Sequence, residues 1–72
     1  MRIRFSCYND FILSDGTVVC REGNAYELRK EQGDRLWTLY ELNPFEDDPI
    51  ILRDVSLDAF RRTNCFDEEL PF

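Results

Sequence analysis

The side chains whose types and spacing could do the most chemistry lie together in the last seven residues of the 72-residue sequence. These residues are Phe66, Asp67, Glu68, Glu69, Leu70, Pro71 and Phe72. The three carboxylates can pair with arginine or lysine on a partner, and Leu70 and Phe72 offer apolar side chains to a shallow pocket. Because Pro71 restricts the backbone between them, little conformational entropy is lost on docking. We expect this segment to bind a protein that has a basic surface beside an apolar pocket.

The same segment resembles the acidic C-terminal tip of bacterial single-stranded-DNA-binding proteins. In that family a run of acids is followed by Ile or Leu, then Pro, then a final Phe with a free carboxylate, which is the order found here. The resemblance implies that residues 65–72 form a tip that recruits or inhibits a genome-maintenance enzyme of replication, repair or recombination. It does not extend before Phe66, because the long linker rich in Gly, Pro and Gln is missing. The alternative is an acidic terminus whose last apolar residues fold back onto the domain.

A second group of acids suggests a different class of function. Its members are Glu46, Asp47, Asp48, Asp54 and Asp58. Such a group could imitate a row of phosphates and block an enzyme that binds DNA, as small acidic inhibitors of phage origin do. It could equally be a solvated surface that keeps the protein soluble. A DNA-mimic inhibitor acting through this acidic surface is therefore the alternative function.

Catalytic chemistry is not expected from this sequence. The absence of His removes the usual general base near neutral pH and every Ser-His or Cys-His pair. The three glycines stand too far apart to form a loop that cradles phosphate. Cys7, Cys20 and Cys65 lack the paired spacing of a zinc site or of a disulfide framework. We therefore expect no enzyme, no catalytic residue, no metal and no other cofactor.

The charge balance limits the classes of partner. With 15 Asp and Glu against nine Lys and Arg, the net charge is −6, which repels nucleic acid and anionic membranes. Arg2, Arg4 and Tyr8 share one face of an expected strand and could contact a single strand of nucleic acid. The surplus of acids argues against this use, so direct nucleic-acid binding and membrane binding are not expected. Neither a membrane span nor a signal peptide is apparent, which makes the cytoplasm the expected compartment.

The pattern of apolar residues predicts a small β domain over residues 1–64. In residues 2–8, Ile3, Phe5 and Cys7 alternate with polar side chains, as in a half-buried strand. Further runs of β-branched and aromatic residues between turn signals predict strands at 17–20, 25–30, 35–42 and 50–53. The core is expected to contain Ile3, Phe5, Tyr26, Leu28, Trp37 and Leu39.

The period changes after the fifth predicted strand. Asp54 or Ser56 can cap a short helix through Leu57 and Phe60. A helix after the fifth strand favours a small five-stranded SH3-like barrel over an OB-like one, whose helix usually lies between the third and fourth strands. Residues 22–42 also resemble small SH3-like barrel proteins of bacteria and phages, in which Gly-x-x-Tyr opens a strand before a tight turn. The expected fold is thus mainly β with a short C-terminal helix and an acidic tail.

Overall fold

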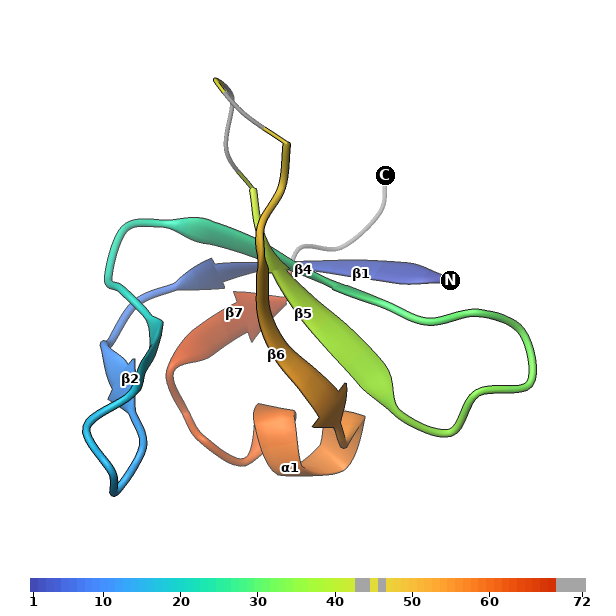
Figure 1. Cartoon of the computed structure of the whole chain (residues 1–72). Coiled ribbons are helices and arrows are strands. Elements are labelled where there is room, and N and C mark those ends of the chain that lie inside the picture. Colours follow the sequence, from blue (N-terminus) through green and yellow to red (C-terminus); the bar gives the residue numbers. More distant parts are fainter. Residues whose placement is uncertain (43–44, 46, 69–72) are drawn as a thin grey trace.

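The structure, a computed structural model, describes residues 1–42, 45 and 47–68, and the fold within them is mainly β (Figure 1). The elements in chain order are β1 (Arg2–Cys7), β2 (Phe11–Ile12), β3 (Val18–Cys20), β4 (Ala25–Arg29), β5 (Trp37–Glu41), β6 (Ile50–Val55), α1 (Leu57–Arg61) and β7 (Phe66–Glu68). Five strands form one antiparallel sheet in the order β6-β5-β4-β1-β7, and β2 pairs with β3 in a separate ribbon. The prediction of a mainly β fold with one short helix is confirmed, and the five-stranded antiparallel sheet is compatible with the predicted small barrel.

The strands predicted at 2–8, 25–30, 35–42 and 50–53 correspond to β1, β4, β5 and β6. The segment at 17–20 is also a strand, β3, but it belongs to the ribbon rather than to the main sheet. The fifth place in the sheet is taken by β7, which lies within the segment that the sequence assigned to the tip. Its neighbour β1 is about sixty residues earlier in the chain, with Cys7 opposite Phe66.

The ribbon is a hairpin that turns at residues 14–16. Gly16 has a φ of 91°, a left-handed conformation that glycine adopts without steric cost. Three hydrogen bonds fix the turn. The Leu13 N–H donates to the Thr17 carbonyl over 2.8 Å, and the Gly16 N–H donates to the Leu13 carbonyl over 2.9 Å. The Thr17 N–H donates to Asp15 Oδ1 over 2.9 Å. The ribbon supplies the buried side chains of Val19 and Cys20 to the core.

Ser56, one of the two predicted caps, begins helix α1. Its Oγ accepts a hydrogen bond from the Ala59 N–H over 3.4 Å, which satisfies one donor of the first turn. Asp54 lies instead at the end of β6 with a φ of 58°, where the chain bends toward the helix. The short helix buries Phe60 against the sheet.

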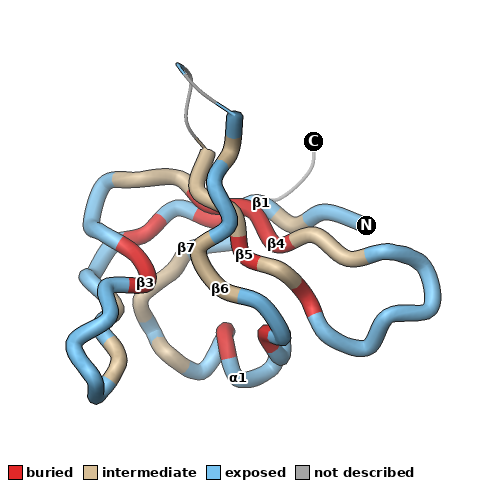
Figure 2. Tube along the Cα trace, in the orientation of Figure 1, coloured by how far each residue is buried: buried red, intermediate tan, exposed pale blue. Residues whose placement is uncertain are grey.

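The core lies between the main sheet, the ribbon and α1, and each of these contributes buried residues (Figure 2). Phe5, Tyr26, Leu28, Trp37 and Leu39 are buried as predicted, whereas Ile3 is half-buried and packs against the core from its margin. Cys7, Val19, Cys20, Val55 and Phe60 complete the buried apolar set. Among the described residues, no helix has the length and apolar character that a membrane crossing requires.

Candidate functional site

The predicted tip divides into a part within the sheet and a part outside the described residues. Phe66, Asp67 and Glu68 form β7, which lies antiparallel beside β1 at one margin of the sheet. Glu69, Leu70, Pro71 and Phe72 lie outside the described residues. The beginning of the predicted tip is therefore a structural strand.

Phe66 holds β7 to the domain through contacts with four aromatic rings. It stacks on Phe60 with a centroid separation of 4.2 Å. It also meets Phe5, Phe11 and Tyr26 edge to face, with centroids 6.2 to 6.4 Å apart. Ring pairs in this range add stability beyond the apolar area that they bury. Phe66 thus anchors the segment, a role that the sequence did not assign to it.

The two described acids of the tip have different surroundings. Asp67 is exposed and lies opposite Ser6, so it is on the face of the sheet away from the core. Glu68 accepts two hydrogen bonds from Arg61 Nη2 of α1, at 3.0 and 3.1 Å. The pair ties the end of β7 to the helix, but it lies at the surface, where such pairs contribute little to stability. Asp67 is the acid that remains directed to solvent.

The acids of the second predicted surface are not gathered into one row. Asp47 is exposed just before β6, whereas Asp54 and Asp58 are exposed at the other end of that strand and in α1. A strand of this length spans about 20 Å. Asp48 accepts a 2.7 Å hydrogen bond from Arg29, and Glu46 lies outside the described residues. The geometry therefore separates the acids that the DNA-mimic hypothesis would use together.

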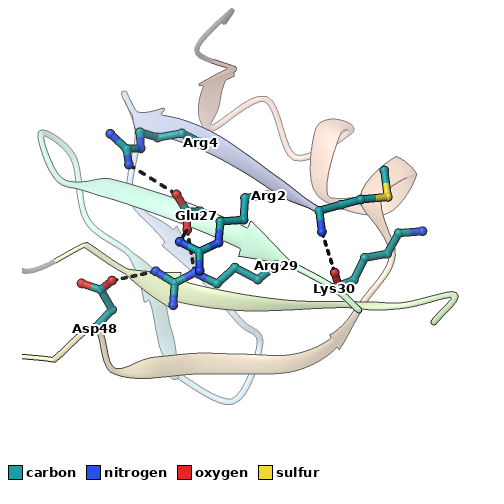
Figure 3. Close-up of polar contacts among 7 residues, drawn as sticks. Arg2, Arg4, Glu27, Arg29, Lys30 and Asp48 are labelled. Atoms are coloured by element: carbon teal, nitrogen blue, oxygen red, sulfur yellow. Dashed lines mark hydrogen bonds and ion pairs between the residues drawn. The ribbon is translucent and has the colours of Figure 1, made fainter. Parts of the chain in front are cut away.

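A charged cluster that the sequence did not single out covers the outer face of the sheet (Figure 3). At its centre is Glu27 of β4, which is only 4% exposed. Arg29 Nε lies 2.6 Å from Glu27 Oε1, Arg4 Nη2 lies 3.4 Å from Oε2, and Arg2 Nη1 lies 3.7 Å from Oε1. A buried carboxylate needs such partners, because an unpaired charge is costly to remove from water. We call Arg2, Arg4, Glu27 and Arg29 the Glu27 cluster.

Arg29 is the most fully engaged cation of the cluster. It also donates to Asp48 Oδ2 over 2.7 Å, and its guanidinium carbon lies 4.2 Å from the centre of the Tyr40 ring. The hydrogen bond to Glu27 raises the pKa of Arg29, and the bond to Asp48 acts in the same direction. Arg29 is therefore a structural partner of Glu27, fixed on three sides.

The cluster arises from the register of two strands. The pairing of β1 with β4 places Arg4 opposite Glu27 and Arg2 opposite Arg29 on the outer face. The predicted core positions of Tyr26 and Leu28 are confirmed, and successive side chains of a strand point to opposite faces, so Glu27 and Arg29 face away from the core. The sequence does show two charged residues at alternate positions in each of the two strands. Only the strand register shows that the charges of one strand lie beside those of the other.

The three cysteines are free thiols in this structure. Burial raises the pKa of the Cys20 thiol strongly, so this side chain is protonated at neutral pH. Burial also raises the pKa of Cys7, whose Sγ lies 2.9 Å from the Asn9 carbonyl oxygen. Within residues 1–42, 45 and 47–68, no three His, Cys, Asp or Glu side chains are grouped so that they could hold a metal ion.

Comparisons with known protein families, with characterised proteins and with solved structures give no match to this chain. The tip and the Glu27 cluster are therefore interpreted from their own chemistry.

Proposed function

We propose that this chain is a non-enzymatic protein-binding module that docks its acidic tip onto a DNA replication, repair or recombination enzyme. The observation that carries the proposal is the order of residues that directly follows an anchored strand: acid, aliphatic side chain, proline and aromatic ring, in Glu69, Leu70, Pro71 and Phe72. That order resembles the tip of single-stranded-DNA-binding proteins. The partner is an enzyme with an apolar pocket and a basic rim.

The anchoring of β7 supports a close form of docking. Phe66 packs against Phe60 and three further rings, and Glu68 pairs with Arg61. Four residues beyond β7 can reach at most about 14 Å when fully extended. A tip that enters a pocket over this distance brings the domain itself against the enzyme surface. The domain would then cover the enzyme surface around the pocket. This favours inhibition of the enzyme, or competition with the tips of single-stranded-DNA-binding proteins, over loose tethering of the chain to the enzyme.

The polar residues of the segment contribute differently to this docking. Asp67 is exposed and available to a basic rim, which speeds encounter through long-range attraction. Glu68 must exchange Arg61 for a cation of the partner, at little cost because the pair is close to solvent. Leu70 and Phe72 supply the apolar contacts on which affinity depends most.

A capture experiment tests the proposal. The chain ending at Phe72, the chain lacking Pro71 and Phe72, and a Phe45→Ala variant are immobilised and exposed to bacterial lysate. Phe45 is 92% exposed, so this variant controls for loss of a surface aromatic ring elsewhere. We expect the intact chain and the control to retain a tip-binding enzyme that the shortened chain does not retain. Equal retention by the shortened chain would refute tip docking and favour an inhibitor that acts through the acids of the domain.

A further inference from the structure

The described part of β7 covers only one half of β1. Their antiparallel pairing runs from Cys7 opposite Phe66 to Phe5 opposite Glu68. Because the strands are antiparallel and β1 begins at Arg2, the chain leaves β7 in the direction of the other half of β1. A continuation in the same register would add to the sheet there.

The main chain of Arg4 points toward this continuation. Bonded positions alternate along an antiparallel pair. On the side of β4, Met1 and Lys30 exchange hydrogen bonds of 2.9 and 3.0 Å, so the odd residues of β1 bond to β4. On the other side, just beyond β1, the Tyr8 N–H donates to the Cys65 carbonyl over 2.8 Å, so the even residues bond toward β7. The N–H and C=O groups of Arg4 are thus directed to the path of the chain beyond β7.

The side chains of β7 show which face each later residue would take. Phe66 and Glu68 lie on the face that α1 covers, since they contact residues of that helix. Asp67 lies on the outer face. Because successive side chains of a strand alternate, the continuation would direct Glu69 to the outer face and Leu70 to the core face.

Both of these side chains meet a suitable neighbour in this register. Glu69 comes opposite Arg4, whose side chain is 55% exposed on the outer face and lies 3.4 Å from Glu27 (Figure 3). A guanidinium has five donors, so Arg4 can bind a second carboxylate. Leu70 comes opposite Ile3, which is half-buried and packs against the core from its margin. A leucine in this place would extend the core over Ile3.

The order of residues in the tip fits this register and no longer strand. A shift by one residue would move Leu70 to the outer face beside the arginines and Glu69 to the margin of the core. Pro71 would come opposite Arg2, but it has no N–H to donate to the Arg2 carbonyl. The pairing would therefore end at Pro71.

The chain's own end is a better occupant of this edge than a segment of another protein. Since it is joined to β7, it is held beside β1 at a high effective concentration. A segment from a partner would have to displace it. An extension of three residues that ends at a proline can also open locally without unfolding the domain.

We propose that residues 69–71 extend β7 along β1 and so hold the tip in a closed form, which must open before the tip can dock. In the closed form Glu69 pairs with Arg4, and Leu70 covers Ile3. A leucine that packs against Ile3 cannot enter the pocket of an enzyme at the same time. The pairing itself is independent of the proposed function, whereas its effect on docking rests on that function.

Amide hydrogen exchange measured by NMR tests the pairing without any enzyme. The Arg4 N–H should exchange at least about tenfold more slowly in the full chain than in the chain truncated after Glu68. The Cys7 N–H donates to the Asn24 carbonyl over 3.0 Å on the side of β4, so it is the control and should exchange equally in both chains. Equal Arg4 rates in the two chains would overturn the proposal.

A charge reversal in the tip tests the register. Glu69→Lys places a cation opposite Arg4 and should move the Arg4 exchange rate toward that of the truncated chain. Glu31→Lys makes the same change at an exposed position outside the tip and should leave the Arg4 rate unchanged. If both variants keep the slow Arg4 rate of the parent, Glu69 does not lie opposite Arg4 and the proposed register is wrong.

Displacement of a fluorescent single-stranded-DNA-binding-protein tip peptide from a tip-binding enzyme tests the effect on docking. Ile3→Thr removes the apolar contact with Leu70 and leaves the tip sequence intact. Because opening raises the fraction of chains able to dock, this variant should displace the peptide at a concentration at least about threefold lower than the parent. Ile50→Thr, at an exposed position of β6 in the opposite margin of the sheet, is the control and should match the parent. The Cys7 amide shows whether each variant remains folded.

The combined results separate this proposal from the proposed function. Displacement by the parent together with equal Arg4 rates would keep tip docking and overturn the closed form. A slow Arg4 amide with no displacement by any chain would support the pairing and refute tip docking. If Ile3→Thr speeds Arg4 exchange but displaces the peptide no better than the parent, the pairing does not limit docking and the proposed closed form is wrong.

Discussion

Glu27 is the residue on which the outer face of the sheet depends. Its carboxylate is removed from water and is held by Arg29 at 2.6 Å, with Arg4 and Arg2 at longer range. If Glu27 lost its negative charge, the guanidinium groups of Arg2, Arg4 and Arg29 would lie close together without the carboxylate that now balances them. Loss of one partner from such a cluster lowers the free energy of unfolding strongly, because the remaining charges stay close together in a partly desolvated place.

We therefore predict that Glu27→Gln lowers the free energy of unfolding by about 3 kcal/mol. The measurement is urea denaturation followed by tryptophan fluorescence of Trp37. Glu31→Gln, at an exposed position just beyond β4, is the control and should change stability by less than about 0.5 kcal/mol. Identical denaturation midpoints for both variants would show that Glu27 is effectively solvated.

The thiol of Cys20 gives a pH-dependent prediction. Burial raises its pKa in the folded protein, whereas the unfolded thiol ionises near the ordinary value of 9.0. Above that pH the unfolded state therefore holds fewer protons than the folded state, so the free energy of unfolding falls as pH rises. Between about pH 8 and pH 10.5 the thiol should cost about 2 kcal/mol of stability.

Urea denaturation of the parent and of Cys20→Ala at these two pH values checks this prediction. Between the two pH values the free energy of unfolding should fall less for the variant than for the parent. At the lower pH the variant is already less stable, because the substitution leaves a cavity. The pKa of Tyr26 is also raised by burial, and this effect acts in the same direction in both proteins. Equal pH dependence of the parent and the variant would show that Cys20 ionises freely in the folded state.

At the scale of the elements, β7 joins the domain to the tip. It is a strand of three residues, and its attachment rests on the ring of Phe66 and on pairing with β1. Because Phe66 is half-buried, its truncation removes part of an aromatic cluster rather than a fully enclosed side chain.

We predict that Phe66→Ala lowers the free energy of unfolding by about 3 kcal/mol, at the lower end of the range for buried phenylalanine. Phe45→Ala removes the same ring from a position that is 92% exposed and should change stability by less than about 0.5 kcal/mol. Thermal denaturation of both variants measures the difference. If Phe66→Ala is as stable as Phe45→Ala, Phe66 belongs to the solvated tip and β7 is not anchored.

The same elements show what the sequence can predict about this fold. Strict alternation identified β1, and a run of strand-forming residues between turn signals identified β4. The polar residue before Leu57 identified the start of α1. All of these signals are local. The strand β7 could not be found in this way. It is short, two of its three residues are acids, and it exists through pairing with Cys7 and packing against Phe60. The Glu27 cluster was missed for a related reason, since it depends on strand register.

At the scale of the whole molecule, the sheet margin formed by β1 and β7 carries the start of the proposed docking segment. Arg2 and Arg4 lie along β1, while β7 ends in acids beside it. The chain as a whole carries a net charge of −6. An enzyme with an apolar pocket and a basic rim would thus approach this margin, and the negative charge of the chain would speed the encounter.

The central claim, tip docking, is tested most directly by competition. A fluorescent peptide that carries the tip of a bacterial single-stranded-DNA-binding protein is bound to several tip-binding enzymes and titrated with this chain. We expect the chain ending at Phe72 to displace the peptide from at least one enzyme. Deletion of Phe72 should weaken displacement at least about tenfold, equivalent to about 1.4 kcal/mol. Failure to displace the peptide from any of them at about 500 μM, a concentration at which even weak specific binding is measurable, would contradict tip docking.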